Sequence, residues 1–137
     1  MNYWLLKSEP ETWSWQQQVK RGAKGETWDG VRNHQAANFM KAMKKGDLAF
    51  FYHSGKERAI VGIVEIIKEH YPDPTDAGER FVAVTVRAKD ALPKPLSLKE
   101  IKAEPKLADL LLIKQSRLSV MPINKSAWKT MLAMART

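Results

Sequence analysis

Hydrophobic residues recur along the chain in stretches that predict β-strands separated by helices. The stretches are 3–8, 47–54, 58–69, 80–91 and, shorter, 118–121. Two of them, 47–54 and 58–69, are apolar on both faces, so both of their faces should be covered. Residues 80–91 alternate valines with other side chains, which predicts a strand by its period of two.

Helices are expected where apolar residues keep helical spacing behind a side chain that can cap the first turn. The expected caps are Ser14 for a helix over 15–21, Asn33 for a second helix ending near Gly46, Ser97 for a helix over 98–102, and Asn124 for a last helix. The second helix has its apolar stripe at Ala36, Phe39, Met40 and Met43, and the last has its stripe at Trp128, Met131, Leu132 and Ala135. A further helical stretch is expected at 106–113.

Turn-forming residues separate these elements. Residues 24–30 and 71–78 are rich in Gly, Pro or Asp and predict loops. Pro93 and Pro95 predict that the strand over 80–91 breaks at 92–95.

The order of these elements indicates the fold class. Consecutive strands at short spacing favour antiparallel pairing. Strands with two apolar faces require closure into a barrel or helices packed against them. A length of 137 residues fits one domain. We therefore expect a single α+β domain over 1–137, with a small mixed β-barrel or strongly curved sheet and flanking helices.

The chain is strongly basic, with 23 Lys and Arg against 15 Asp and Glu, a formal net charge of +8 and a sequence pI of about 9.8. Such a chain should attract polyanions, nucleic acid first and anionic membrane second, although a merely basic protein is the alternative. The start of the chain is not typical of a signal peptide, and no apolar stretch approaches the roughly 18 residues of a membrane span. A cytoplasmic protein with no membrane partner, and a monomer, is expected.

The sequence offers little support for catalysis or metal binding. It contains no cysteine, which excludes disulfides and a cysteine nucleophile. His34, His53 and His70 lack the spacing of metal ligands, so no metal and no cofactor is expected. Ser126 and Lys129 match Ser-x-x-Lys without its companion motifs and fit the start of the last helix. We expect a protein that is not an enzyme.

Several aromatic and basic residues outside the expected core suit recognition of an unstacked base. Trp28 lies in the glycine-rich segment, and Tyr52 and His53 end an apolar strand. Positive charge is supplied by Lys7, Arg32, Arg117 and the cluster Lys41, Lys44 and Lys45. Each has a structural alternative, since Trp28 can cover the core and the clustered lysines can form the solvated face of a helix.

Seven short runs occur in a fixed order along the chain. They are Lys7-Ser-Glu-Pro10, Trp28-Asp-Gly-Val-Arg-Asn33, Gly46-Asp47, Phe51-Tyr-His-Ser54, Val61-Gly62, Tyr71-Pro-Asp73 and Gln115-Ser-Arg-Leu-Ser-Val120. Through these runs the chain resembles the EVE-domain family from about Tyr3 to Met134. The resemblance implies a PUA-like fold, related to the YTH domains, and a pocket for a chemically modified base in DNA or RNA. It implies no catalytic activity and no cofactor.

The same resemblance implies roles for individual residues of this pocket. Ser8 would offer its hydroxyl to the base edge, and Trp28 would form an aromatic wall. Lys7 belongs to the same run but alternates away from Ser8 along the strand. Arg32 would meet a phosphate or a base acceptor. Asn33 would either bind the base edge or cap the second helix.

Four further residues complete the expected pocket. Tyr52 and His53 would close its floor or rim, although strand alternation lets only one of them point fully inward. Arg117 and Ser119 share one face of an extended segment and would offer a charge and a hydroxyl to the same ligand. Their alternative is local pairing on the strand.

Two other functions stay open at this point. An enzyme, or a protein that binds a small molecule or nucleotide, would use the same cavity with Ser8, His53 and Arg117 as working groups. That role requires the serine and the histidine to lie within hydrogen-bond reach. A pocket lined wholly by apolar groups would instead favour an interaction protein with a purely structural cavity.

Overall fold

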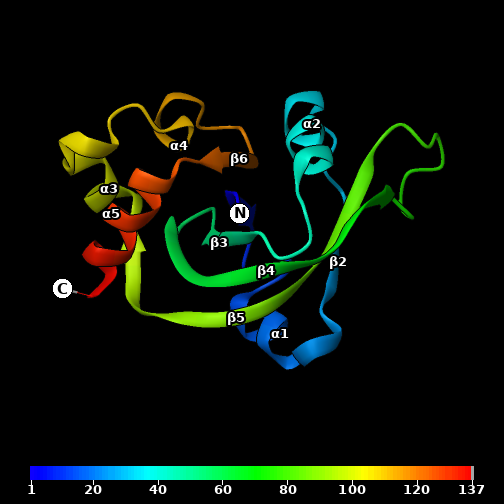
Figure 1. Cartoon of the computed structure of the whole chain (residues 1–137), viewed down its shortest axis with the longest axis horizontal. Coiled ribbons are helices and arrows are strands. Elements are labelled where there is room, and N and C mark those ends of the chain that lie inside the picture. Colours follow the sequence, from blue (N-terminus) through cyan, green and yellow to red (C-terminus); the bar gives the residue numbers. More distant parts are fainter. Residues whose placement is uncertain (137) are drawn as a thin grey trace.

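The apolar stretches of the sequence form one six-stranded sheet in the computed structural model, which describes residues 1–136 (Figure 1). The strands are β1 (Tyr3–Ser8), β2 (Glu26–Trp28), β3 (Leu48–His53), β4 (Ala59–Pro72), β5 (Val82–Ser97) and β6 (Val120–Ile123). The helices are α1 (Trp15–Lys20), α2 (His34–Ala42), α3 (Leu98–Ala103), α4 (Leu111–Lys114) and α5 (Lys125–Arg136), with short 3-10 turns at Gly22–Lys24 and Pro105–Leu107. Among residues 1–136, no helix is long and apolar enough to span a membrane.

The sheet is curved and mixed but does not close. Its strand order is β2-β5-β4-β3-β1-β6, so β2 and β6 are the two edges. β1 pairs with β3 in parallel, and β3–β4, β4–β5, β2–β5 and β1–β6 are antiparallel pairs. The long strands β4 and β5 bend together across the molecule (Figure 1). The prediction of an α+β fold with flanking helices is therefore confirmed. Of the two expected forms, the strongly curved sheet is present rather than the closed barrel.

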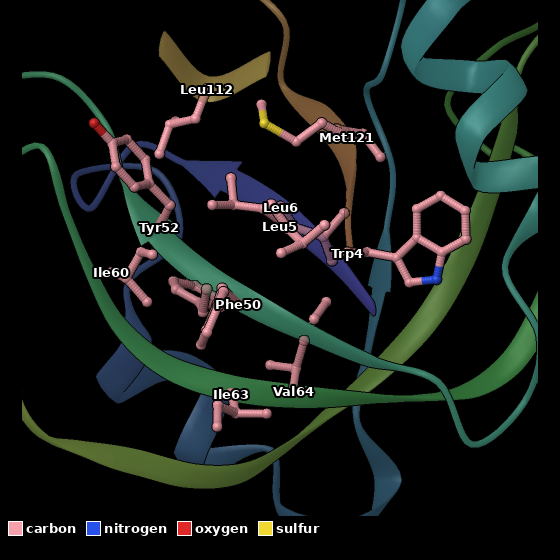
Figure 2. Packing of buried hydrophobic residues seen from close by; sticks show 14 of the residues in the cluster. Trp4, Leu5, Leu6, Phe50, Tyr52, Ile60, Ile63, Val64, Leu112 and Met121 are labelled. Carbon is pink, nitrogen blue, oxygen red and sulfur yellow. The ribbon is translucent and has the colours of Figure 1, made fainter. Parts of the chain in front are cut away.

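Both faces of β3 are covered, as its two apolar faces require. On one face, Phe50 stacks on Trp128 of α5, with ring centroids 3.8 Å apart. On the other face, Phe51 meets Trp15 and Trp28 edge-on, with centroids 5.4 and 5.5 Å away. Figure 2 shows how side chains of β1, β3 and β4 pack into one apolar cluster around Phe50. The centre of the sheet at β3 is thus buried on both sides.

The expected helix caps are present, because each depends on neighbouring residues alone. Ser14 and Ser97 each form a capping box at the start of α1 and α3. Asn33 and Asn124 accept hydrogen bonds from backbone N–H groups three residues later, at 2.9 and 2.8 Å. These side chains satisfy backbone donors that a helix start leaves unpaired.

The segment 24–30, expected to be a loop, contains the edge strand β2. Trp28 pairs with Val84 of β5 in this strand. Gly25, just before it, has a φ of 71°, and a Cβ at this position would collide with the carbonyl of Val86. The glycine therefore lets the chain approach β5 closely enough to pair, which the turn-like composition conceals.

The expected break at 92–95 was wrong, because β5 continues to Ser97. Ala91 pairs with Gly62, and Leu96 pairs with Ile60. The four residues of β5 between these pairs, 92–95, therefore lie opposite a single residue of β4, Val61. Proline is tolerated at such a bulge because the ladder requires no N–H there.

The helical stretch expected at 106–113 divides into the 3-10 turn Pro105–Leu107 and the short helix α4. Leu107, Leu110 and Leu112 are all buried. Residues two apart lie on different faces of one continuous helix, so burying both Leu110 and Leu112 requires the chain to bend between them. The last strand likewise begins at Val120 rather than at residue 118.

Candidate functional site

A hollow of about 430 Å³ opens where the end of β1 meets β2 and the segment that leads from β2 to α2. Its volume falls in the range of about 300–1,000 Å³ that ligand pockets occupy. We term it the first hollow. Of the residues that the sequence assigns to a pocket, it gathers Lys7, Ser8, Trp28, Arg32 and Ser119.

Trp28 is held at the wall of the first hollow by the pairing of β2 with β5. Its ring meets Phe51 edge-on, with an interplanar angle of 89°. The residue is 7% exposed and belongs to the apolar core. One indole therefore packs against the core and also lines the hollow, and its role as the wall of a base pocket stays a prediction.

A second indole, Trp13, lines the first hollow, and the sequence alone does not indicate it. Its Nε1 donates to Oε1 of Gln18 at 2.9 Å, and Nε2 of Gln18 donates to the carbonyl of Val86 at 3.2 Å. Gln18 is fully buried. This link through Gln18 fixes the Trp13 ring relative to β5 before any ligand binds.

The segment between β2 and α2 is held by the carboxylate of Asp73, in the loop between β4 and β5. Asp73 is 2% exposed and accepts hydrogen bonds from the N–H of Gly30 at 2.8 Å and from Nη1 of Arg32 at 3.0 Å. It also accepts from the N–H and the hydroxyl of Thr75, at 2.7 and 2.6 Å. Burial alone would raise the pKa of Asp73, but these hydrogen bonds outweigh it and lower the pKa from 3.8 to about 2. The carboxylate is therefore charged at neutral pH.

Arg32 lines the first hollow as a member of this hydrogen-bonded cluster. Its guanidinium pairs with Asp73, donates to Oγ1 of Thr75 at 3.0 Å, and lies 5.4 Å from the ring centroid of Phe81. Because Asp73 offsets its charge, Arg32 is not a free cation at the rim. Its contacts join the segment between β2 and α2 to the loop between β4 and β5.

Lys7 and Ser8 end β1 beside the hollow. The hydroxyl of Ser8 donates to the carbonyl of Trp13 at 2.6 Å, so its oxygen is left to accept a hydrogen bond from a ligand. Nζ of Lys7 donates to the carbonyl of Ser116 at 2.8 Å and lies 5.7 Å from the ring centroid of Tyr52. Burial lowers the pKa of Lys7.

A second hollow, of about 470 Å³, adjoins the first because Lys7, Glu9 and Ser119 line both. Tyr52 and Arg117 line this second hollow. Figure 2 shows the phenolic oxygen of Tyr52 pointing away from the apolar side chains around it. Burial raises the pKa of Tyr52, so the phenol stays neutral. Seven of the nine expected pocket residues are therefore divided between two adjacent hollows, and Asn33 and His53 line neither.

Asn33 and His53 are engaged in contacts within the fold. Oδ1 of Asn33 accepts from the N–H of Ala36 at 2.9 Å, which is the cap of α2. His53 is buried, its Nε2 accepts from the N–H of Trp15 at 3.0 Å, and its Nδ1 lies 3.1 Å from Oε1 of Glu57. Asn33 thus caps the start of α2, and His53 links the end of β3 to the start of α1.

Ser8 and His53 lie opposite one another in the β1–β3 register. The hydroxyl proton of Ser8 is nevertheless donated to the carbonyl of Trp13, and Nε2 of His53 accepts from the N–H of Trp15. This arrangement is not that of a serine–histidine dyad. Within residues 1–136, no group of three or more His, Asp or Glu side chains is placed to hold a metal ion.

The first hollow has mixed charge. Glu9, Glu26 and Asp29 line it together with Lys7 and Arg32. Its chemistry is that of a polar ligand site with aromatic walls, because two indoles offer stacking surfaces and the carboxylates accept hydrogen bonds. Such a lining does not fit a purely structural, wholly apolar cavity.

Comparison with known proteins shows what the whole chain is similar to. A family model for the EVE domain matches residues 2–134. Thymocyte nuclear protein 1 of Mus musculus is 33% identical, in an alignment that covers 99% of this chain and 74% of the mouse protein.

Solved structures show the same arrangement of elements. Rpa0253 from Rhodopseudomonas palustris is 54% identical, with a TM-score of 0.94 over 99% of this chain and 94% of that one. Human THYN1 protein in complex with 5-methylcytosine-containing DNA is 30% identical, with a TM-score of 0.93 over 100% of this chain and 99% of that one. The YTH domain of Zygosaccharomyces rouxii MRB1 protein, in complex with N6-methyladenosine RNA, is 15% identical with a TM-score of 0.59 over 98% of this chain and 86% of that one. This last likeness confirms the expected relation to YTH domains at the level of the fold.

Proposed function

This chain belongs to the EVE-domain family, and from that premise we propose that it is a non-enzymatic protein that binds nucleic acid and seats one modified base in the first hollow. Human THYN1, which shares the fold at 30% identity, is in complex with DNA that contains 5-methylcytosine. That base is therefore the first ligand to test on this chain.

The pair of indoles in the first hollow is the observation that carries this proposal. A base removed from its stack requires aromatic surfaces, and each base stacked on an aromatic side chain gains about 1–3 kcal/mol. Trp13 is fixed through Gln18, and Trp28 is fixed by the pairing of β2 with β5. Because the fold already holds both rings, little side-chain conformational entropy is lost when a base binds between them.

The polar residues of the same hollow supply partners for the edge of the base. Asp29 is exposed at its rim, and its carboxylate can accept from an exocyclic amino group such as that of cytosine. The oxygen of Ser8 accepts as well, since its proton is donated to Trp13. Lys7 provides a donor for a base carbonyl or a phosphate.

The proposal is tested by titrating the protein with two labelled single-stranded oligonucleotides that differ only in one 5-methylcytosine. We expect tighter binding of the modified strand. Trp13→Ala should weaken binding of that strand by about tenfold or more and reduce the preference, because it removes one stacking surface. Trp13 is chosen because truncating the more deeply buried Trp28 would cost about 3–5 kcal/mol of stability.

Phe39→Ala is the matched aromatic control. Phe39 lies on α2 and packs near Trp4, with ring centroids 6.4 Å apart, outside the first hollow. It should leave the preference unchanged. Equal binding of both strands by the unmutated protein, or no effect of Trp13→Ala, would contradict the base-binding role.

The same titration separates the remaining alternatives. RNA strands of matching sequence distinguish the two polymers. Binding of the free nucleoside or nucleotide without binding of either strand would favour a small-molecule protein that uses the same cavity.

A further inference from the structure

The second hollow carries cations that form no ion pair within the described residues 1–136. Arg58, Lys102 and Arg117 line it together with Lys7, and Glu9 is its carboxylate. Within residues 1–136, the side chains of Arg58, Lys102 and Arg117 form no ion pair and no hydrogen bond. These three charges are therefore available to an anionic ligand.

A third hollow, of about 350 Å³, continues from the second because Arg58, Leu98 and Lys102 line both. It adds Lys56 and Lys99, together with the carboxylate of Glu57, which lies 3.1 Å from Nδ1 of His53. We term the six cations of these two hollows the cationic track: Lys7, Lys56, Arg58, Lys99, Lys102 and Arg117. The track begins at Lys7, which also lines the first hollow.

The fold brings the track together from four separate segments: β1, the turn between β3 and β4, α3, and the segment between α4 and β6. Arg58 lies in the turn between β3 and β4 with a φ of 48°, and its carbonyl accepts from the N–H of Leu98 at the start of α3 at 2.8 Å. Lys102 belongs to α3 itself. Arg117 follows Ser116, whose carbonyl accepts from Nζ of Lys7. A left-handed backbone at a residue other than glycine costs about 1 kcal/mol or more and is found chiefly where the surrounding structure requires it.

On the opposite side of the first hollow, the cation that lines it is Arg32. Asp73 offsets Arg32 there, and the carboxylate of Asp76 accepts hydrogen bonds in the same loop between β4 and β5. A polyanion that occupies the first hollow is therefore attracted toward α3 rather than toward α2. In Figure 1, α3 lies at the left of the view and α2 at the top, right of the centre.

We propose, on the basis of the proposed function, that the nucleic-acid strand whose base occupies the first hollow leaves it over the second hollow. There Arg58, Lys102 and Arg117 contact the phosphodiester groups next to the bound base, and the strand continues toward Lys56 and Lys99. These contacts provide affinity that does not depend on sequence, while the first hollow provides the selection of the base.

The test compares two triple variants with the same change in charge. The track variant is Arg58→Gln, Lys102→Gln and Arg117→Gln. The control variant is Lys41→Gln, Lys44→Gln and Lys45→Gln, at exposed positions on and just after α2. Both are titrated, over a series of salt concentrations, with the single-stranded oligonucleotides with and without 5-methylcytosine.

We expect the track variant to bind the modified strand about tenfold more weakly or worse at low salt. Its slope of log K against log salt should fall by about 2, since each phosphate contact on a single strand contributes about 0.7. Its preference for the modified strand should persist, because the first hollow is intact. The control variant should keep both the affinity and the slope.

Two results would overturn the track while leaving the proposed function in place: equal losses in the two variants, or no loss in the track variant. Loss of the base preference in the track variant would also count against it, because the two hollows would then not act separately. If the unmutated protein binds neither strand, the proposed function fails and this inference fails with it.

A second measurement tests the direction of the strand. Two oligonucleotides carry the modified base at one end and extend from it with opposite polarity. Since the track lies on one side of the first hollow, the track variant should weaken binding of only one of them. Equal weakening of both would contradict a single path.

Discussion

Asp73 joins the two loops beside the first hollow through hydrogen bonds from Gly30, Arg32 and Thr75. Asp73→Asn removes the charge that pairs with Arg32 and turns one acceptor into a donor. The part-buried donors of Gly30, Arg32 and Thr75 then lose a charged acceptor, and leaving such groups poorly partnered is costly. We expect the free energy of unfolding, measured in urea at neutral pH, to fall by about 2–4 kcal/mol.

The pH dependence of this effect follows from the pKa of Asp73, which folding lowers from 3.8 to about 2. The stability that the ionised carboxylate contributes is present above about pH 4 and is lost as the pH falls through about 2. The difference between the unmutated protein and Asp73→Asn should therefore be constant at higher pH and shrink by about 2 kcal/mol across that interval.

Asp109→Asn is the matched control for this carboxylate. Asp109 pairs with Lys114 at 3.1 Å, but its side chain is 95% exposed. Exposed pairs contribute about 0–1 kcal/mol, so this change should be nearly neutral. Equal costs for the two substitutions, or a difference at Asp73 that does not change with pH, would show that the hydrogen-bonded cluster is not held by charge.

The residues of the site differ in how far the sequence can indicate them. Trp28 stands in a run of distinctive composition, so its place in the site could be predicted. Trp13 and Asp73 could not, because their roles depend on Gln18 and on Gly30, Arg32 and Thr75, whose contacts exist only in the folded chain. The single signal for Asp73 is the run Tyr71-Pro-Asp73, which by composition indicates only a turn.

At the level of elements, local chemistry determined what could be predicted. Helix starts were found because a cap depends on residues within one turn. The edge strand β2 was missed because its three residues form a strand only through pairing with β5. The extension of β5 through Pro93 and Pro95 depends on a bulge opposite β4, and no pattern within β5 itself encodes that partner.

Gly62 of β4 tests how tightly the elements under the site pack. A Cβ added there would lie about 2.5 Å from ring carbons of Trp15, at the start of α1. Trp15 is 8% exposed and packs against Phe51, so it has little room to move. We expect Gly62→Ala to lower the free energy of unfolding by about 1–3 kcal/mol, because the core is overpacked.

Gly78→Ala provides the comparison for this substitution. The nearest atom to an added Cβ at Gly78 is Oδ1 of Asp76, at 3.4 Å, which is an ordinary contact. The change should stay within about 0.5 kcal/mol in the same urea measurement. A Gly62→Ala variant as stable as Gly78→Ala would mean that Trp15 and α1 are not closely packed on β4.

At the level of the whole molecule, net charge and its distribution are separate properties. The total of +8 was available from composition and indicates polyanions as candidate partners. The concentration of this charge around the second and third hollows could not be predicted from composition. Arg58, Lys102 and Arg117 lie far apart in the sequence and meet only in the fold. Whether the curved sheet closes was also undetermined, since closure depends on the pairing of its two edge strands.

The most direct measurement of the base-binding role is an NMR titration of the labelled protein with the strand that contains 5-methylcytosine. The shifts should centre on the indole N–H signals of Trp13 and Trp28 and on the backbone of residues 29–32, with the cytosine strand producing weaker changes at the same signals. Shifts confined to α2 and its lysines, or identical shifts with both strands, would contradict a base seated between the end of β1 and β2.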